Sequence, residues 1–447
     1  MRLARFAVIF LLAVTLNAQE NPREKELRTR IDSLEKRLAE VEAKLALLAS
    51  PGIVKAPEAA PAAAAAVVPA VIPKEAEPGV TGLFRDTTLN ATVDGYYAYN
   101  FNRPYDRVNQ LRAFDQSHNS FSLNQATIML ERTPNVDAGR RFGVRLDLQF
   151  GQATQTLQGS QANENRPEIY RAIFQAYGTY VFPIGSGLQA DFGKFASSLG
   201  YETNYTKDQM NYSRSYWFNY LPYYHFGFRN TYNFNSKLTA QYWLVNGSNQ
   251  SEDFNGFKTQ AFLLITKPKK TVTWNATYYV GQEGRPATSC IAYGNLTPYQ
   301  CDTLTPNGRG HVFDTYLNWS PANSKWTVAL EADYTINRIG AHSAPGRVDG
   351  GAAYLQYQAT PKFAFAGRFE LVQDRRGFFS GRDQTLKEFT LTGTRQFADG
   401  FQAKFEYRRD FSNEPFFVTD QFGVLKRNQD TATLGLIWWF GGKTGSW

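Results

Sequence analysis

The sequence has 447 residues, of which 43% are hydrophobic, 15% aromatic and 20% charged, and its formal net charge is +8. Only 2 Cys and 3 Met stand against 35 Gly, 34 Phe and 25 Tyr, which excludes a disulfide scaffold or a cysteine zinc site and favours β-structure. The 48 basic and 40 acidic residues give a mixed charge that does not indicate a nucleic-acid partner. No apolar run reaches the roughly 18 residues of a membrane-spanning helix.

The chain begins with the pattern of a secretory signal peptide. Arg2 and Arg5 give a basic start, residues 6–16 form an apolar stretch, and a small-residue cleavage site ends at Ala18. We therefore predict a signal peptide over residues 1–18. An uncleaved membrane anchor is the alternative, but the apolar stretch is too short to span a bilayer. The pattern indicates export.

Residues 19–49 predict a short coiled-coil helix. Apolar residues recur at alternating spacings of 4 and 3 from Leu27 to Leu48, which is a heptad pattern. Residues 30–35 and 37–42 resemble the Arg-apolar-x-x-apolar-Glu motif of parallel trimeric coiled coils, so we expect a homotrimer. A solvated helix with ion pairs between successive turns is the alternative.

Residues 50–79 are rich in Ala and Pro and predict an extended linker. From about residue 88 onward the apolar pattern changes to period 2, which indicates strands with two different faces. In segment 326–337, for example, Leu330 and Tyr334 lie on one face while Glu331 and Asp333 lie on the other. A soluble β-sandwich would show the same alternation, so the connections between strands must decide the fold.

About sixteen strands are expected within residues 80–447, joined alternately by short turns and longer loops. Such a pattern predicts an all-β fold, a transmembrane antiparallel up-and-down β-barrel in the outer membrane, preceded by the periplasmic coiled-coil helix. The short turns and the N-terminal region are then expected on the periplasmic side. The predicted strands span residues 88–102, 121–132, 142–151, 169–182, 188–196, 223–234, 238–247, 258–267, 271–282, 311–320, 326–337, 348–360, 363–374, 385–397, 401–411 and 430–440.

The closing segment carries a further signal. Residues 433–440, TLGLIWWF, resemble the terminal signal that the barrel-assembly machinery reads, with a glycine and two aromatic residues at the expected spacing. We therefore expect this machinery as a partner during biogenesis and membrane lipid as a permanent one. The sequence departs from the usual pattern because seven residues, Gly441 to Trp447, follow the signal.

Two early segments resemble a known family. Residues 93–104 read VDGYYAYNFNRP, and residues 121–126 read FSLNQA. Together they are similar to the opening of the OmpL-like outer-membrane porins, a family of β-barrel channels of Gram-negative bacteria. The resemblance implies a porin but names no substrate, and it does not extend to the coiled coil or the linker.

The inward face of such a barrel would line the lumen, since the apolar face meets lipid. Sixteen strands leave room for an aqueous channel, through which we expect small hydrophilic solutes to diffuse passively. Residues 80–447 carry 37 basic and 30 acidic residues, which predicts at most mild anion selectivity. For each inward charge, an ion pair that stiffens the wall is the alternative. Pore-lining candidates are Arg145, Asp147, Arg171, Arg229, Glu331, Asp333, Arg368, Glu370, Lys404, Glu406 and Arg408.

The third long loop, residues 197–222, combines charged residues with several aromatic ones. In general porins the third loop forms the constriction of the channel, with its charges facing those on the wall. By this analogy we nominate Glu202, Asp208 and Arg214 as constriction residues. The aromatic side chains would pack the loop against the wall or, alternatively, contact the face of a sugar.

Cys290 and Cys301 both lie in the long loop of residues 283–310. An exported protein with two cysteines in one exposed loop most simply has them paired, so we expect a disulfide there. A metal site in this loop would need more ligands, and of the histidines only His311 is near. We therefore predict no metal site. No cofactor is expected either, because passive diffusion through water needs none.

An enzyme is the main rival class, because some outer-membrane barrels are hydrolases. The chain has four histidines and no Gly-x-Ser-x-Gly or His-Glu-x-x-His motif, so no catalytic residues are predicted. A Ser–His arrangement formed by separate strands stays open, because triads are defined in space. A structural alternative also stays open: the barrel could anchor the coiled coil, which would hold the envelope together.

Overall fold

The computed structural model describes residues 86–158, 164, 166–284, 287–291, 300–304, 306–398 and 400–443, together with the helical residue Lys36. The chain divides into two units, Met1–Glu75 and Ala76–Trp447. Apart from Lys36, the predicted signal peptide, coiled coil and linker lie outside the described residues and stay predictions.

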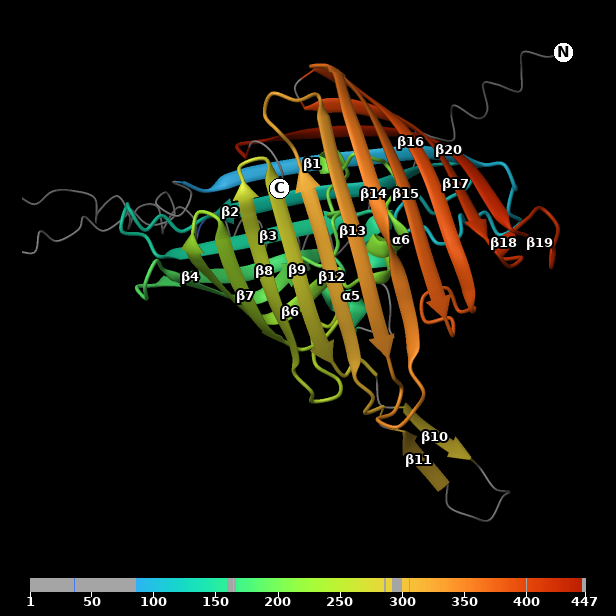
Figure 1. The fold of residues 1–447 in the computed structure, drawn as a ribbon, viewed down its shortest axis with the longest axis horizontal. Helices are drawn as coiled ribbons and strands as arrows, with labels where there is room; N and C mark the ends of the chain where they lie inside the picture. Colours follow the sequence, from blue (N-terminus) through green and yellow to red (C-terminus); the bar gives the residue numbers. More distant parts are fainter. Residues whose placement is uncertain are drawn as a thin grey trace, which may run out of the picture. The chain divides into compact units, whose positions relative to one another are not determined.

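Sixteen strands among the described residues form one closed antiparallel barrel in sequence order (Figure 1). The last strand closes against the first, with Gly435 opposite Tyr96. The predicted barrel of about sixteen strands is therefore confirmed. The strands are β1 (Thr88–Asn100), β2 (Ser120–Arg132), β3 (Phe142–Phe150), β4 (Ile173–Phe182), β5 (Leu188–Ala196), β6 (Tyr224–Asn235), β7 (Leu238–Val245), β8 (Thr259–Lys269), β9 (Val272–Gly281), β12 (Gly310–Trp319), β13 (Trp326–Asn337), β14 (Gly346–Thr360), β15 (Phe363–Arg375), β16 (Gln384–Ala398), β17 (Phe401–Ser412) and β20 (Asn428–Gly441).

The longer loops contain short elements that the sequence analysis did not predict. They are α4 (Gln152–Gln158), α5 (Pro167–Tyr170), η1 (Thr206–Asp208), α6 (Tyr216–Tyr220) and the hairpins β10 (Ala287–Ile291) with β11 (Gln300–Leu304) and β18 (Phe417–Val418) with β19 (Leu425–Lys426). In the described part of the chain, no helix has the length and apolarity to cross a bilayer.

One predicted strand start is wrong. β4 begins at Ile173 rather than at residue 169, because Pro167 starts the short helix α5 in its first turn. Arg171 is the C-cap of that helix and is exposed, so it does not lie on the barrel wall. Every other predicted strand end lies within two residues of the observed one.

The strands present apolar side chains outward and polar ones inward. On β15, Phe365 and Phe369 are about half exposed, while Arg368 and Glu370 are buried. On β13, Leu330 is likewise exposed, while Glu331 and Asp333 are buried. A soluble protein would bury the phenylalanines; in a bilayer, lipid solvates them and closure of the barrel satisfies every strand's backbone. The apolar face of the strands therefore points outward and the polar face inward, as predicted.

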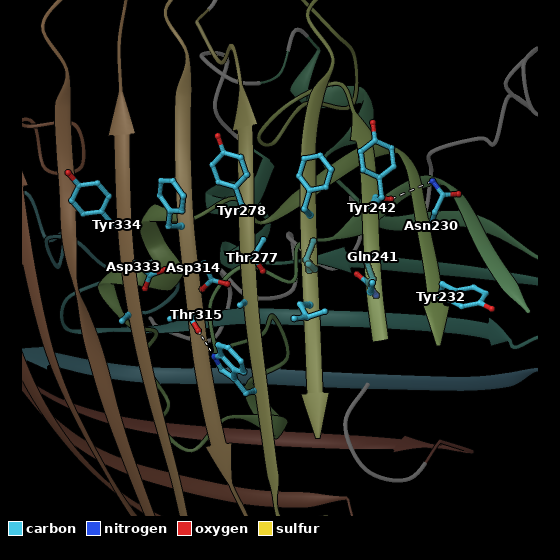
Figure 2. Close-up of a pocket in the computed structure, with 18 of the residues that line it drawn as sticks. Asn230, Tyr232, Gln241, Tyr242, Thr277, Tyr278, Asp314, Thr315, Asp333 and Tyr334 are labelled. Carbon is cyan, nitrogen blue, oxygen red and sulfur yellow. Dashed lines mark hydrogen bonds between the residues drawn. The ribbon is translucent and has the colours of Figure 1, made fainter. Parts of the chain in front are cut away.

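A row of aromatic rings crosses the outer surface at one level (Figure 2). Tyr242, Phe262, Tyr278, Phe313 and Tyr334 are successive cross-strand partners on β7, β8, β9, β12 and β13. The ring centroids of Tyr278 and Phe313 lie 4.8 Å apart. The row borders an outward-facing hollow of about 960 Å³. Such a row is typical of the aromatic girdle at a membrane interface, so this hollow lies on the outer face that we expect to contact lipid.

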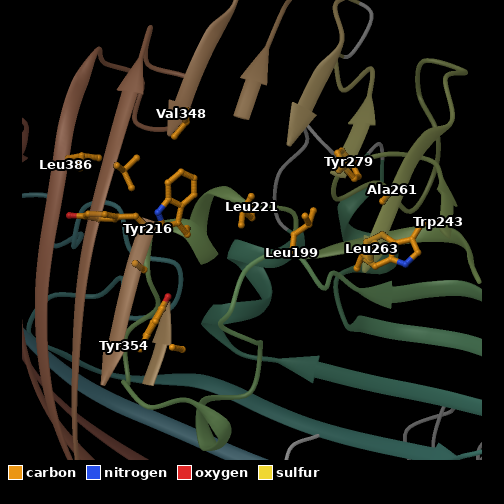
Figure 3. Close-up of a cluster of buried hydrophobic side chains, with 14 of the residues drawn as sticks. Leu199, Tyr216, Leu221, Trp243, Ala261, Leu263, Tyr279, Val348, Tyr354 and Leu386 are labelled. Carbon is orange, nitrogen blue, oxygen red and sulfur yellow. The ribbon is translucent and has the colours of Figure 1, made fainter. Parts of the chain in front are cut away.

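The loop between β5 and β6, residues 197–223, which we call L3, lies inside the barrel and contacts inward residues of several strands. Its residues Leu199 and Leu221 pack in a buried apolar cluster with wall residues that include Trp243, Leu263 and Tyr279 (Figure 3). Apolar contacts therefore hold L3 against one side of the barrel interior. Tyr216 and Trp217 of L3 belong to the same buried cluster, so these two aromatic side chains pack against the wall. Contact of other L3 aromatic side chains with a sugar stays a prediction.

The hairpin of β10 and β11 places Cys290 directly opposite Cys301. Opposed residues of antiparallel strands have Cα atoms about 4.5–5.5 Å apart, a spacing that a disulfide bridges. We therefore predict that a maleimide added to the denatured, unreduced protein labels neither cysteine, and that it labels both after reduction. Two labelled cysteines before reduction would contradict the pairing.

Candidate functional site

Wall glutamates accept hydrogen bonds from pairs of consecutive backbone amides in L3. Glu406 on β17 accepts from the amides of residues 212–213 at 2.6 and 2.9 Å. Glu370 on β15 accepts from the amides of residues 216–217 at 3.0 and 3.4 Å. Residues 216–217 are the first turn of α6, whose free amides favour a negative partner. Each glutamate therefore fixes both the position and the direction of the loop.

Other acidic residues on the wall bind the rest of L3. Asp314 accepts from the amide of Gly200 at 2.9 Å, and Glu331 accepts from the amide of Tyr201 at 3.1 Å. Tyrosine hydroxyls of the loop donate to further wall carboxylates. These pairs are Tyr205 with Asp147, Tyr212 with Asp94, and Tyr216 with Asp410. Anchors therefore run along the whole length of the loop.

Two wall arginines complete this network. Arg368 contacts Glu202 of L3 at 2.7 Å and Glu388 of β16 at 2.7 Å, and it also donates to the Ser213 carbonyl at 2.8 Å. Arg408 donates to the Arg214 carbonyl. Both guanidinium groups are buried, where a charge is stable only if paired and hydrogen-bonded. Removing either arginine would therefore leave several buried groups without their hydrogen-bond or ion-pair partner.

The predicted pore-lining residues, Arg171 excepted, all lie on barrel strands. Most of them are buried between the wall and L3 rather than open to water; Arg229 is only partly buried. Arg145 pairs with Asp147 at 2.9 Å, and Arg229 pairs with Asp191 at 2.8 Å. The residues at these positions form ion pairs or bind L3. A role of the same residues in ion selectivity stays a prediction.

Of the nominated constriction residues, Arg214 and Asp208 contact other residues of L3, while Glu202 binds Arg368 of the wall and the Ser215 amide of L3. Arg214 is buried and donates to the carbonyls of Thr203 and Asn204 at 3.0 and 2.9 Å. Burial lowers the pKa of Arg214, although the carboxylate of Glu202 opposes this. Asp208 pairs with Lys207 at 2.7 Å. Arg214 and Glu202 thus hold the loop in shape, and their contact with a solute stays a prediction.

Cavities lie beside L3 at three places. One of about 220 Å³ is lined by Arg145, Arg229 and Glu202, among others. A second, of about 160 Å³ and near the short turns, is lined by Lys207, Lys362 and Lys404 together with several glutamines. A third, of about 390 Å³, lies near the long loops and includes Glu283 and Arg338. A solute that passes L3 would meet mixed charge, with a basic surplus near the short turns.

Sequence reasoning did not nominate several buried charges that complete the site. Strand alternation could have identified three of them, because Asp94, Glu388 and Asp410 occupy inward positions on strands, like the nominated residues. Arg112 had no such signal: it lies in the loop after β1, yet its guanidinium reaches Asp410 at 2.7 Å. Only the folded chain shows this contact.

One Ser–His contact bears on the enzyme alternative. The Nε2 atom of His225 lies 3.2 Å from Ser197 Oγ, and its Nδ1 atom lies 3.0 Å from the Gly247 carbonyl oxygen. A nucleophilic serine needs an accessible histidine that a third group orients as a base. His225 is fully buried, and within the described residues its other nitrogen contacts a backbone carbonyl. The pair fits a structural role.

Comparison with known proteins identifies a family model that matches most of this chain. The model of the family described as "Putative beta-barrel porin-2, OmpL-like" matches residues 86–440. No curated protein matches the sequence. Among solved structures, OprB of Pseudomonas putida superposes with a TM-score of 0.50 at 13% identity, covering 80% of this chain and 96% of that one. This match shows a shared fold.

Two further solved structures are similar at lower scores. An anion-selective porin from Comamonas acidovorans has a TM-score of 0.49 at 10% identity and covers 79% of this chain and 99% of its own. The trimer form of OmpT from Vibrio cholerae gives the same values, a TM-score of 0.49 at 10% identity with 79% and 99% covered.

Proposed function

Because this chain belongs to the OmpL-like β-barrel porin family, we propose that it is an outer-membrane channel through which small hydrophilic solutes diffuse passively. The observation that carries the proposal is a closed barrel with a polar inner face and a long loop anchored inside it. A loop held in this way narrows a channel without any chemistry on the solute. The proposal needs no cofactor and no catalytic residue.

We propose mild anion selectivity for this channel. Residues 80–447 carry 37 basic and 30 acidic residues, and three lysines line the cavity near the short turns. Rings of side-chain charge set such preferences. Buried acidic residues that are paired with arginines, such as Glu388, contribute little to the preference, because the arginines compensate their charge.

We further propose a homotrimer with its N-terminal region in the periplasm. The heptads of residues 27–48 support three chains. The short turns lie at the end of the barrel where β1 begins, and in outer-membrane barrels short turns face the periplasm. The coiled coil would then join the three barrels on that side.

Planar-bilayer recording of the purified, refolded mature protein tests the channel. We expect discrete conductance steps in groups of three and, under a salt gradient, a reversal potential with a small anion preference. Lys362→Gln should reduce that preference, because Lys362 lines the basic cavity. The control Lys237→Gln changes an exposed turn lysine that does not line that cavity and should leave the preference unchanged.

Strong cation preference would contradict the proposed selectivity. A folded barrel without conductance would contradict the channel itself and favour the anchoring role. In that case deletion of residues 20–80 should cause envelope defects, since the coiled coil would carry the function.

A further inference from the structure

Three buried carboxylates meet where the wall contacts the start of L3. Asp314 of β12 is directly opposite Asp333 of β13, and Glu331 lies two residues before Asp333 on the same strand. Each offers one oxygen atom, and the three oxygens lie within 4.8 Å of one another. The three residues are 2%, 5% and 4% exposed for Asp314, Glu331 and Asp333. Three acidic groups therefore share one small space that is almost closed to water.

Most of this negative charge has no visible compensation. Asp314 and Glu331 accept the L3 amides described above, and Glu331 also accepts from the Tyr354 hydroxyl at 2.9 Å. Both oxygens of Asp333 and Oδ2 of Asp314 are buried without a hydrogen-bond partner among the described residues. The neighbouring acidic residue Glu388, in contrast, pairs with two arginines. Buried carboxylates without such partners are strongly destabilised unless they are protonated or bind a cation.

A single shared proton does not compensate the negative charge of the three carboxylates. A proton between Asp314 and Asp333 neutralises one charge and leaves two more in the same space. A divalent cation neutralises two and uses the unpartnered oxygens as ligands. Ligands made only of oxygen select a hard cation, Ca²⁺ or Mg²⁺.

The burial of the site separates these two cations. Mg²⁺ gives up its water reluctantly and usually keeps several water ligands, whereas Ca²⁺ accepts protein oxygens in flexible geometry. The three carboxylates are almost closed to water, which suits the cation that binds mainly protein oxygens. We propose that Asp314, Glu331 and Asp333 bind a calcium ion between the barrel wall and the first residues of L3.

Such an ion would join three segments of the chain. Its ligands come from β12 and β13, and two of them also hold the amides of Gly200 and Tyr201. Calcium would therefore fix the base of L3 to the wall. The sequence analysis predicted no metal site because these ligands form no contiguous motif: two strands must first pair in the correct register.

Terbium luminescence tests the site directly, because Tb³⁺ replaces Ca²⁺ and is excited by nearby tyrosines. Tyr354 contacts Glu331, so the full-length, EDTA-washed protein in detergent should show saturable luminescence. Ca²⁺ should displace Tb³⁺ at lower concentration than Mg²⁺. Asp333→Asn should weaken binding about tenfold or more, since it removes one of three charged ligands.

The matched control is Asp191→Asn, which changes a buried inward carboxylate that is already paired with Arg229. It should bind Tb³⁺ like the wild type. Heat-modifiable gel mobility reports folding, and Asp314→Asn replaces Asp333→Asn if the latter does not fold. Ca²⁺ should also raise the unfolding temperature of the wild type more than that of Asp333→Asn.

Absence of saturable Tb³⁺ or Ca²⁺ binding by the folded wild type would overturn the proposal and indicate carboxylates neutralised by protons. Equal affinity in folded Asp333→Asn and wild type would also overturn it. Neither measurement requires an open channel, so this result is independent of the proposed function.

Discussion

Replacing residues 205–214 of L3 by two glycines is expected to raise the single-channel conductance severalfold. The deleted segment includes Tyr205 and Tyr212, which bind wall carboxylates on β3 and β1, and it contains the residues that bind Glu406 on β17. The new ends can meet, because the Ser215 amide already donates to Glu202 at 2.6 Å. Removing this part of the loop opens the space it fills in the barrel interior.

The measurement is single-channel recording at fixed salt on protein whose folding is verified by heat-modifiable mobility. Deletion of residues 421–424, which are exposed between β18 and β19, is the control and should leave the conductance unchanged. If the L3 deletion folds and conducts like the wild type, L3 is not the constriction.

Arg368→Ala is expected to lower the free energy of unfolding by about 3–5 kcal/mol, the usual cost of removing one member of a buried ion pair. The guanidinium is buried and contacts Glu202 and Glu388 at 2.7 Å each. Without it both carboxylates stay buried with less compensation, and L3 loses a link to β15. The change should appear as a lower urea midpoint, followed by tryptophan fluorescence in lipid vesicles.

Arg375→Ala is the matched control, because Arg375 lies on the same strand with its side chain 51% exposed and its ion pair with Asp349 at 3.5 Å. It should cost less than about 1 kcal/mol, as exposed ion pairs do. Adding Glu202→Gln to Arg368→Ala should recover part of the loss, since Glu202 is ion-paired with Arg368 and would otherwise stay buried as an uncompensated charge. Equal effects of the two alanine variants would show that the Arg368 network contributes little stability.

The barrel wall was predictable because strand alternation is local. On β13 the polar residues Glu331 and Asp333 alternate with Leu330 and Tyr334, and a strand must send alternate side chains to opposite faces. Aromatic and apolar residues on one face of every strand then specify lipid outside. The same argument placed the strand ends within two residues, except where Pro167 begins a helix that period-2 alternation does not describe.

The loops were predictable only in their position along the chain. The sequence showed that residues 197–222 are long, charged and aromatic, and analogy placed them in the lumen. It did not show that Arg214 turns back onto the carbonyls of its own loop, or that Glu406 holds two consecutive loop amides. These contacts depend on backbone direction inside an irregular segment, where no periodicity exists to read.

By itself, then, the sequence determined the class of fold, a barrel of about sixteen strands and the two faces of each strand, because these follow from alternation within each strand and from the alternating short and long connections. Tertiary structure alone decided the partners. Glu202 and Arg368 are 166 positions apart and meet at 2.7 Å, while Asp314 and Asp333 face each other only because β12 and β13 pair in one register. Contacts of this kind are set by closure of the barrel and packing of L3 within it.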